Sequence, residues 1–149
     1  MAHPSDSADQ RQAERATLQA LETLWGVSFI TGTKLPVSVG VAPDGVDLER
    51  KLVVEVYARV GPLKPAQAHK VRADLFKLAY LRKLLGPEWR VVFCFVDHAA
   101  AAFLMGKSWA VHAAQAFGVE VVVQELPAPV RERVVAAQAR QRMTNAPLG

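Results

Sequence analysis

Cysteine is nearly absent from this sequence of 149 residues, which contains only Cys94. One thiol cannot form a disulfide within a single chain, and it cannot build a metal site made of several thiolates. Cys94 lies inside the apolar run 91–96, and burial is the ordinary state of a free cysteine in such a run. We therefore expect Cys94 to be a structural residue of the core.

Long hydrophobic runs are missing as well. A helix that crosses a membrane needs about 20 predominantly apolar residues, and no stretch of this chain reaches that length. The first ten residues are polar and lack the apolar segment of a secretory signal peptide. These absences predict a protein that does not associate with membranes and that resides in the cytoplasm.

The excess of charge of one sign is small, at a net +4, which favours a polyanion such as nucleic acid as partner. Hydrophobic residues make up 51% of the chain and charged residues 21%, which is the composition of a globular protein. The length fits one domain. We expect a single domain over 1–149, with loose tails over 1–8 and 144–149.

The hydrophobic pattern alternates between the two regular periods. Apolar residues at helical spacing, ended by glycine or proline, predict helices over 9–25, 65–85, 98–105, 109–117 and 127–142. Short runs rich in β-branched residues predict strands over 27–30, 35–41, 52–60, 90–96 and 119–123. Because strands alternate with helices, the chain is predicted to be an α/β protein with parallel central strand pairs.

Glu55 is the most unusual residue in this pattern, because it interrupts the apolar strand 52–60. Side chains alternate between the two faces of a strand, so Glu55 shares a face with Val53 and Tyr57. A carboxylate in a buried strand is costly unless another group binds it. The sequence therefore predicts that Glu55 has a cation or a hydrogen-bond donor as partner.

Two upstream aspartates are candidates for a shared cation site. Asp47 precedes Glu55 by eight residues, and an antiparallel hairpin could bring the two carboxylates together. They would repel each other unless a cation lay between them, and Mg²⁺ suits one or two carboxylates because it keeps waters for a phosphate. Asp44 competes for this role. Its Pro-Asp-Gly setting is typical of a turn, so we prefer Asp47.

Two helices add further candidates. Gln67 and Lys70 fall in the first turns of the helix over 65–85, near the predicted end of the Glu55 strand. A lysine there can position a water molecule or stabilise charge on a phosphoryl group in the transition state. Glu22, beside core residues of the first helix, is expected to project over the sheet and support the metal.

Taken together, Glu22, Asp47, Glu55, Gln67 and Lys70 resemble the site pattern of the PD-(D/E)XK nuclease superfamily. The resemblance covers about 90 residues. It implies the restriction-endonuclease-like fold, a three-layer arrangement with a mixed central sheet flanked by helices. It also implies hydrolysis of phosphodiester bonds with Mg²⁺ or Mn²⁺, with Asp47 and Glu55 as metal ligands and nucleic acid, expected to be DNA, as substrate.

One position departs from that family. The family lysine stands two residues after the glutamate, where this chain has Tyr57. Either Lys70 supplies the amine from the helix, or the chain is a degenerate member that binds nucleic acid or a partner protein without cutting. A further alternative is a plain α/β interaction module in which Glu55 pairs with Arg59 or Lys70. A nuclease of this size is expected to need a second copy or a partner protein to cut both strands.

Overall fold

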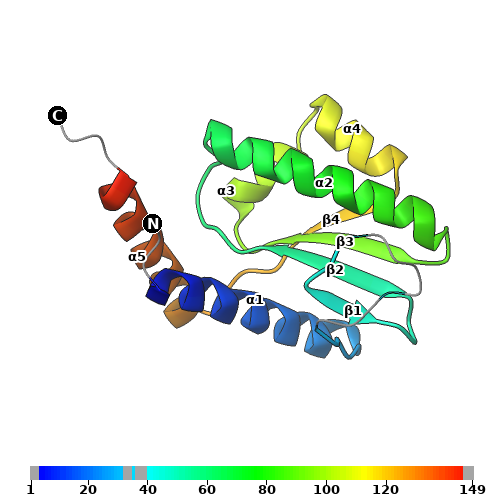
Figure 1. Ribbon diagram of the computed structural model, residues 1–149, viewed down its shortest axis with the longest axis horizontal. Coiled ribbons are helices and arrows are strands. Elements are labelled where there is room, and N and C mark those ends of the chain that lie inside the picture. The colour runs from blue at the N-terminus through cyan, green and yellow to red at the C-terminus, as the bar shows by residue number, and fades with distance from the viewer. Residues whose placement is uncertain (1–3, 32–34, 36–39, 146–149) are drawn as a thin grey trace.

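The computed structural model describes residues 4–31, 35 and 40–145, and Figure 1 shows their arrangement. Five α-helices, one short 3₁₀ helix and four strands follow one another within these residues. The helices are α1 (Pro4–Trp25), α2 (Pro65–Leu85), α3 (His98–Ala101), η1 (Ala102–Leu104), α4 (Trp109–Ala116) and α5 (Ala128–Asn145). The strands are β1 (Gly45–Asp47), β2 (Leu52–Tyr57), β3 (Arg90–Phe95) and β4 (Val119–Val123).

The four strands form one mixed sheet in the order β1-β2-β3-β4. Strand β1 pairs antiparallel with β2, whereas β2, β3 and β4 are parallel to one another. Helix α2 makes the crossover from β2 to β3, and α3, η1 and α4 make the crossover from β3 to β4. The predicted α/β class with parallel central pairs is therefore confirmed.

One face of the sheet is covered by α2, α3 and α4, which lie above it in Figure 1. Val53 and Tyr57 of β2 point to this side, together with Phe93 of β3, and all three are buried. The apolar stripe of α2 packs on them through Val71, Leu75, Leu78 and Leu81. Since side chains alternate along β2, Glu55 faces α2 as well.

The other face is covered by α1 and α5, and α1 lies below the sheet in Figure 1. Val54 and Val56 of β2 point to this side, and they pack with Leu21 of α1 and Val134 of α5. Cys94 belongs to the same cluster and is fully buried, as expected. With both faces covered, the sheet forms the middle of three layers.

Several boundaries differ from the sequence-based expectation. Helix α1 begins at Pro4, so residues 4–8 are helical rather than part of a loose tail. In place of a strand over 27–30, a single antiparallel bridge joins Ile30 to Val46. The strand expected over 35–41 falls mostly outside the described residues. Helix α2 begins and ends at the predicted residues, where Pro65 fits its first turn and Gly86 closes it.

None of the helices in the described part of the chain combines the length and the apolar character needed to cross a membrane.

Candidate functional site

The candidate site lies at the edge of β2 beyond the point where β1 ends, where this edge has no strand partner among the described residues. Strand β1 has three residues, and its register pairs Gly45 with Val54 and Asp47 with Leu52. One residue before Gly45, the Asp44 carboxylate takes the place of a strand and accepts the backbone N–H of Val56 at 2.7 Å. Asp44 therefore lies beside Glu55 at the open edge of the sheet.

Glu55 has an unusual protonation equilibrium in this position. Burial removes water from its carboxyl group and raises its pKa to about 9, and a hydrogen bond with Asp44 together with the negative charges of Asp44 and Asp74 adds to the rise. The positive charge of Lys70 lowers the pKa of Glu55, but this effect is smaller than the combined effect of burial and the two aspartates. At neutral pH, Glu55 is therefore protonated and hydrogen-bonded to Asp44.

Helix α2 supplies the positive charge of the site. Lys70 Nζ lies 3.1 Å from Asp74 Oδ2, one helical turn further along, and the lysine side chain is 63% exposed while that of Asp74 is 14% exposed. This spacing of four residues places both side chains on the flank of α2 that faces Glu55. The structure thus brings the predicted Lys70 to Glu55 and adds Asp74, which we did not predict.

Helix α1 adds a fourth carboxylate, Glu14, which the sequence-based reasoning missed. Burial raises the pKa of Glu14, and the negative charge of Asp44 raises it further, whereas Lys70 lowers it. Glu14 is thus electrostatically coupled to the same site. A signal was present in the sequence, because Glu14 stands three, four and seven residues before the core positions 17, 18 and 21.

Asp47 occupies a different environment from the one we expected. It accepts the backbone N–H groups of Ser28 and Arg50, both at 3.0 Å, and it forms an ion pair with the Arg50 guanidinium at 3.3 Å. The N–H of Ser28, followed by the contacts with Arg50, lowers the pKa of Asp47 despite burial. The expectation that Asp47 lies beside Glu55 is wrong, because the hairpin register places it at the other end of β1.

Glu22 and Gln67 also serve local structure. Glu22 Oε2 accepts the backbone N–H of Phe29 at 3.0 Å and fixes the chain just after α1. Gln67 Oε1 accepts the N–H of Lys64 at 3.0 Å and caps the first turn of α2. Neither side chain contributes to the electrostatic environment of Glu55, in contrast to Asp44, Asp74 and Lys70.

Tyr57, at the position of the family lysine, is part of the core. Its side chain is 3% exposed, and its ring packs against Phe95 with centroids 5.5 Å apart. Its hydroxyl has no hydrogen-bond partner among the residues that the structure describes. A hydroxyl in this position is no substitute for an ammonium group that must reach a phosphate.

The carboxylate oxygens of Asp44 and Glu55 are candidate ligands for a metal ion. Across residues 4–31 and 40–145 there is no group of three or more His, Cys, Asp or Glu side chains arranged to hold an ion. Asp44 and Glu55 nevertheless form a two-carboxylate oxygen site, whose mutual repulsion a divalent cation would relieve. Mg²⁺ binds through one or two carboxylates and retains several waters, so the pair fits this ion.

Comparison of the chain with protein-family models, with curated proteins and with solved structures finds no match in any of the three.

Proposed function

We propose that the protein is a nuclease of the PD-(D/E)XK type that hydrolyses phosphodiester bonds, with DNA as the expected substrate and Mg²⁺ or Mn²⁺ as cofactor. Asp44 and Glu55 would hold the metal. Lys70 would act on the phosphate from α2.

The contact between Asp44 and Glu55 carries this proposal. Two carboxyl groups, one from β2 and one from the segment before β1, meet where burial raises the pKa of Glu55 to about 9. Such a pair destabilises the fold when both groups are ionised, and pairs of this kind are concentrated at functional sites. A divalent cation bound by both carboxylates would replace their mutual repulsion with attraction to the ion.

The order of elements supports the restriction-endonuclease-like fold. The core that the resemblance implies is a helix, three strands, a helix and a strand. Helix α1, the β1–β2 hairpin, α2 and β3 follow this order, with two strands rather than three before α2 in the described residues. The Pro-Asp dipeptide that gives the superfamily its name is present as Pro43-Asp44, 11 residues before Glu55. Asp44 thus fits the motif better than Asp47, although its Pro-Asp-Gly setting is also typical of a turn.

The metal ion and the surrounding side chains would have different roles in the reaction. A bound divalent ion would supply Lewis-acid activation of the phosphate and of a water molecule. Lys70 would donate a hydrogen bond to a phosphate oxygen and stabilise the charge that develops there, while its ion pair with Asp74 keeps the ammonium on the Glu55 side of α2. Glu14 would add negative charge behind Asp44 and strengthen cation binding.

The direct test is cleavage of supercoiled plasmid, linear duplex, single-stranded DNA and RNA with Mg²⁺ or Mn²⁺. Glu55→Gln is expected to abolish cleavage, and Lys70→Met to slow it roughly 10²-fold or more. Lys83→Met is the matched control, because it removes the same charge from an exposed position on the other side of α2. Equal rates for Lys70→Met and Lys83→Met would refute the role of Lys70.

A degenerate module that binds nucleic acid without cleavage is the second candidate, and the burial of Tyr57 favours it. It predicts binding of nucleic acid by the wild type with no hydrolysis of any of the four substrates. The plain interaction module gains no support, since Lys70 forms its ion pair with Asp74 and Arg59 hydrogen-bonds to Gln141.

A further inference from the structure

A polar groove opens beyond the C-terminal end of β2, next to the carboxylate site. It has a volume of about 410 Å³. Its lining comes from the chain after β2, from the start of α2 and from the end of α5. The lining residues are Arg59, Lys64, Gln67, Gln138, Gln141 and Arg142.

The lining has the chemistry of an anion site. Three of its six residues carry a positive charge, the other three carry amide groups, and none is acidic. This contrasts with the adjoining site, where Asp44, Glu55 and Asp74 are all acidic. Arginine, lysine and amide side chains are the groups that contact phosphate oxygens in protein–nucleic acid complexes.

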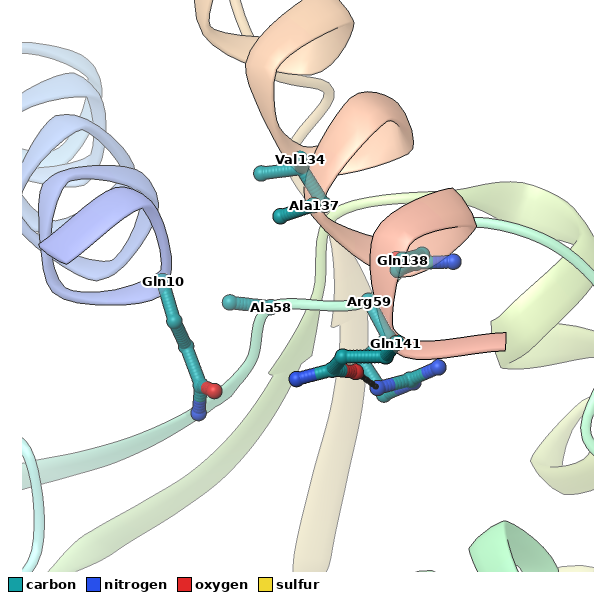
Figure 2. Close-up of a pocket in the computed structure, with 7 residues that line it drawn as sticks. All are labelled: Gln10, Ala58, Arg59, Val134, Ala137, Gln138 and Gln141. Carbon is teal, nitrogen blue, oxygen red and sulfur yellow. Dashed lines mark hydrogen bonds between the residues drawn. The ribbon is translucent and has the colours of Figure 1, made fainter. Parts of the chain in front are cut away.

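The groove is built on a fixed framework. Gln138 of α5 bonds to both backbone groups of Val60, accepting its N–H at 2.9 Å and donating to its carbonyl at 2.8 Å. Arg59 donates to Gln141 at 3.2 Å, as the dashed line in Figure 2 shows. The guanidinium has five N–H donors, so this bond leaves others available to a ligand.

A second clamp holds the same loop. The Asp97 carboxylate, at the end of β3, accepts the N–H of Gly61 at 2.8 Å and forms an ion pair with Arg131 of α5 at 3.0 Å. The loop after β2 is therefore fixed to both β3 and α5. A groove whose walls are held in this way loses little conformational entropy when a ligand binds.

The start of α2 adds to the positive potential. The first turn of α2 contains no acidic residue, and Gln67 caps it from within the groove. The N-terminus of a helix carries a partial positive charge, which favours an anion in front of it. The cationic side chains and the helix end thus act in the same direction.

We propose that this groove binds the phosphodiester backbone of the nucleic-acid strand to one side of the phosphate at Glu55. The inference rests on the proposed nuclease function. Arg59 follows Glu55 by four residues, so the two positions are separated by at most roughly 13 Å, the length of four residues of extended chain. The groove therefore holds phosphates a few nucleotides from the cleaved bond, given a rise of about 3.4 Å per nucleotide.

The test is a salt series of binding measurements with fluorescein-labelled single-stranded and duplex oligonucleotides. All proteins carry Glu55→Gln, which prevents cleavage and mimics the protonated carboxyl group. The groove variant adds Lys64→Gln and Arg142→Gln, two exposed cations in the groove lining. The control adds Lys83→Gln and Lys107→Gln, two exposed cations outside the groove. Inorganic phosphate is titrated as a competitor.

The groove variant is expected to show a salt dependence of log Kd that is shallower by roughly 0.7–0.9 for each phosphate contact removed. The control is expected to keep the slope of the parent, and millimolar phosphate is expected not to displace the oligonucleotide. Equal slopes in the groove variant and the control, or no oligonucleotide binding, would overturn the inference. Displacement by low phosphate concentrations would overturn it in favour of a free-phosphate site.

The two proposals fail separately. Groove-dependent binding without cleavage by the wild type would leave the groove standing and reject the nuclease. Cleavage that requires Glu55, together with binding that ignores the groove substitutions, would reject the groove alone.

Discussion

Two aspartates at opposite ends of β1 lie in different electrostatic environments. Asp47 is buried at one end and is surrounded by donors from Ser28 and Arg50, which lower its pKa. Asp44, next to the other end, is bonded to Val56 N–H but also lies against the carboxyl group of Glu55. Both aspartates accept a backbone N–H. They differ in their other neighbours, which are hydrogen-bond donors around Asp47 and a second carboxyl group beside Asp44.

Asp97 follows the pattern of Asp47. Burial alone would raise its pKa, but the N–H of Gly61 and the Arg131 guanidinium outweigh that effect and lower it. Its bonds join β3 to α5 and to the loop after β2. Asp47 and Asp97 thus stabilise the parts of the fold that surround Asp44 and Glu55.

The largest expected effect is a difference in cleavage rate between substitutions at Asp44 and Asp47. Asp44→Asn removes a proposed metal ligand and is expected to lower the cleavage rate by roughly 10²–10³-fold, comparable to the loss of a key electrostatic group. Asp47→Asn, assayed below its melting temperature, is expected to retain cleavage. Initial rates on the preferred substrate measure the difference. Loss of activity in Asp47→Asn with Asp44→Asn unaffected would reverse our assignment.

The next effect is a pH dependence of stability with opposite signs at the two kinds of site. The folded-state pKa of Glu55 is about 9 and its ordinary value is 4.5, so this group makes the fold less stable as pH rises between those values. The pKa values of Asp47 and Asp97 are lowered, so their contribution is present above their ordinary value of 3.8 and is lost as pH falls below it.

Thermal unfolding from pH 5 to pH 9 without metal measures the Glu55 contribution, on the order of 5 kcal/mol. Glu55→Gln is expected to remove this decline, since it cannot ionise, while Lys83→Gln keeps it. A wild-type profile that is flat over this range would show that Glu55 titrates normally.

The third effect is on stability at neutral pH. Asp47→Asn weakens three charge-assisted contacts at a buried position and is expected to cost about 2 kcal/mol. Asp44→Asn keeps an oxygen that can accept both the N–H of Val56 and the proton of Glu55, so its cost is expected to be smaller. Chemical denaturation at pH 7 compares the two, and a greater loss in Asp44→Asn would contradict the comparison.

The smallest effect concerns Tyr57, which shares a face of β2 with Glu55. Its buried hydroxyl has no hydrogen-bond partner within the described part of the chain, so Tyr57→Phe is expected to leave stability unchanged or raise it by up to about 1 kcal/mol. Cleavage is expected to remain, because Lys70 rather than Tyr57 is the proposed contact to the phosphate. A large loss of activity in Tyr57→Phe would instead assign the hydroxyl a role in the site.

The sequence predicts the elements well where periodicity and stop signals agree. Helix α2 has a regular stripe between Pro65 and Gly86, and β4 lies between Gly118 and a polar segment, so both have the predicted bounds. Helix α1 extends to Pro4, although the polar composition of its first turns also fits a loose tail. Composition alone cannot separate these two states.

The site was predicted only in part, because it depends on strand register. Pro43-Asp44-Gly45 has turn chemistry, but the chain turns over residues 48–51, where Lys51 adopts a φ of +54°. Moving the turn changes which aspartate lies opposite Glu55. Glu55 and Lys70 were predictable from local spacing. The helical spacing of Glu14 places it beside the core stripe of α1, but its approach to Asp44 depends on how α1 packs on the sheet.

The central claim is that Asp44 and Glu55 together bind a divalent cation, and calorimetric titration with Mn²⁺ at pH 7 tests it most directly. Because Glu55 is protonated before binding, the titration should release about one proton per ion, seen as heats that differ between buffers of different ionisation enthalpy. The account predicts this release in the wild type and in Asp47→Asn, and no binding in Asp44→Asn or Glu55→Gln. Binding that persists in Asp44→Asn, or no binding by the wild type, would contradict it.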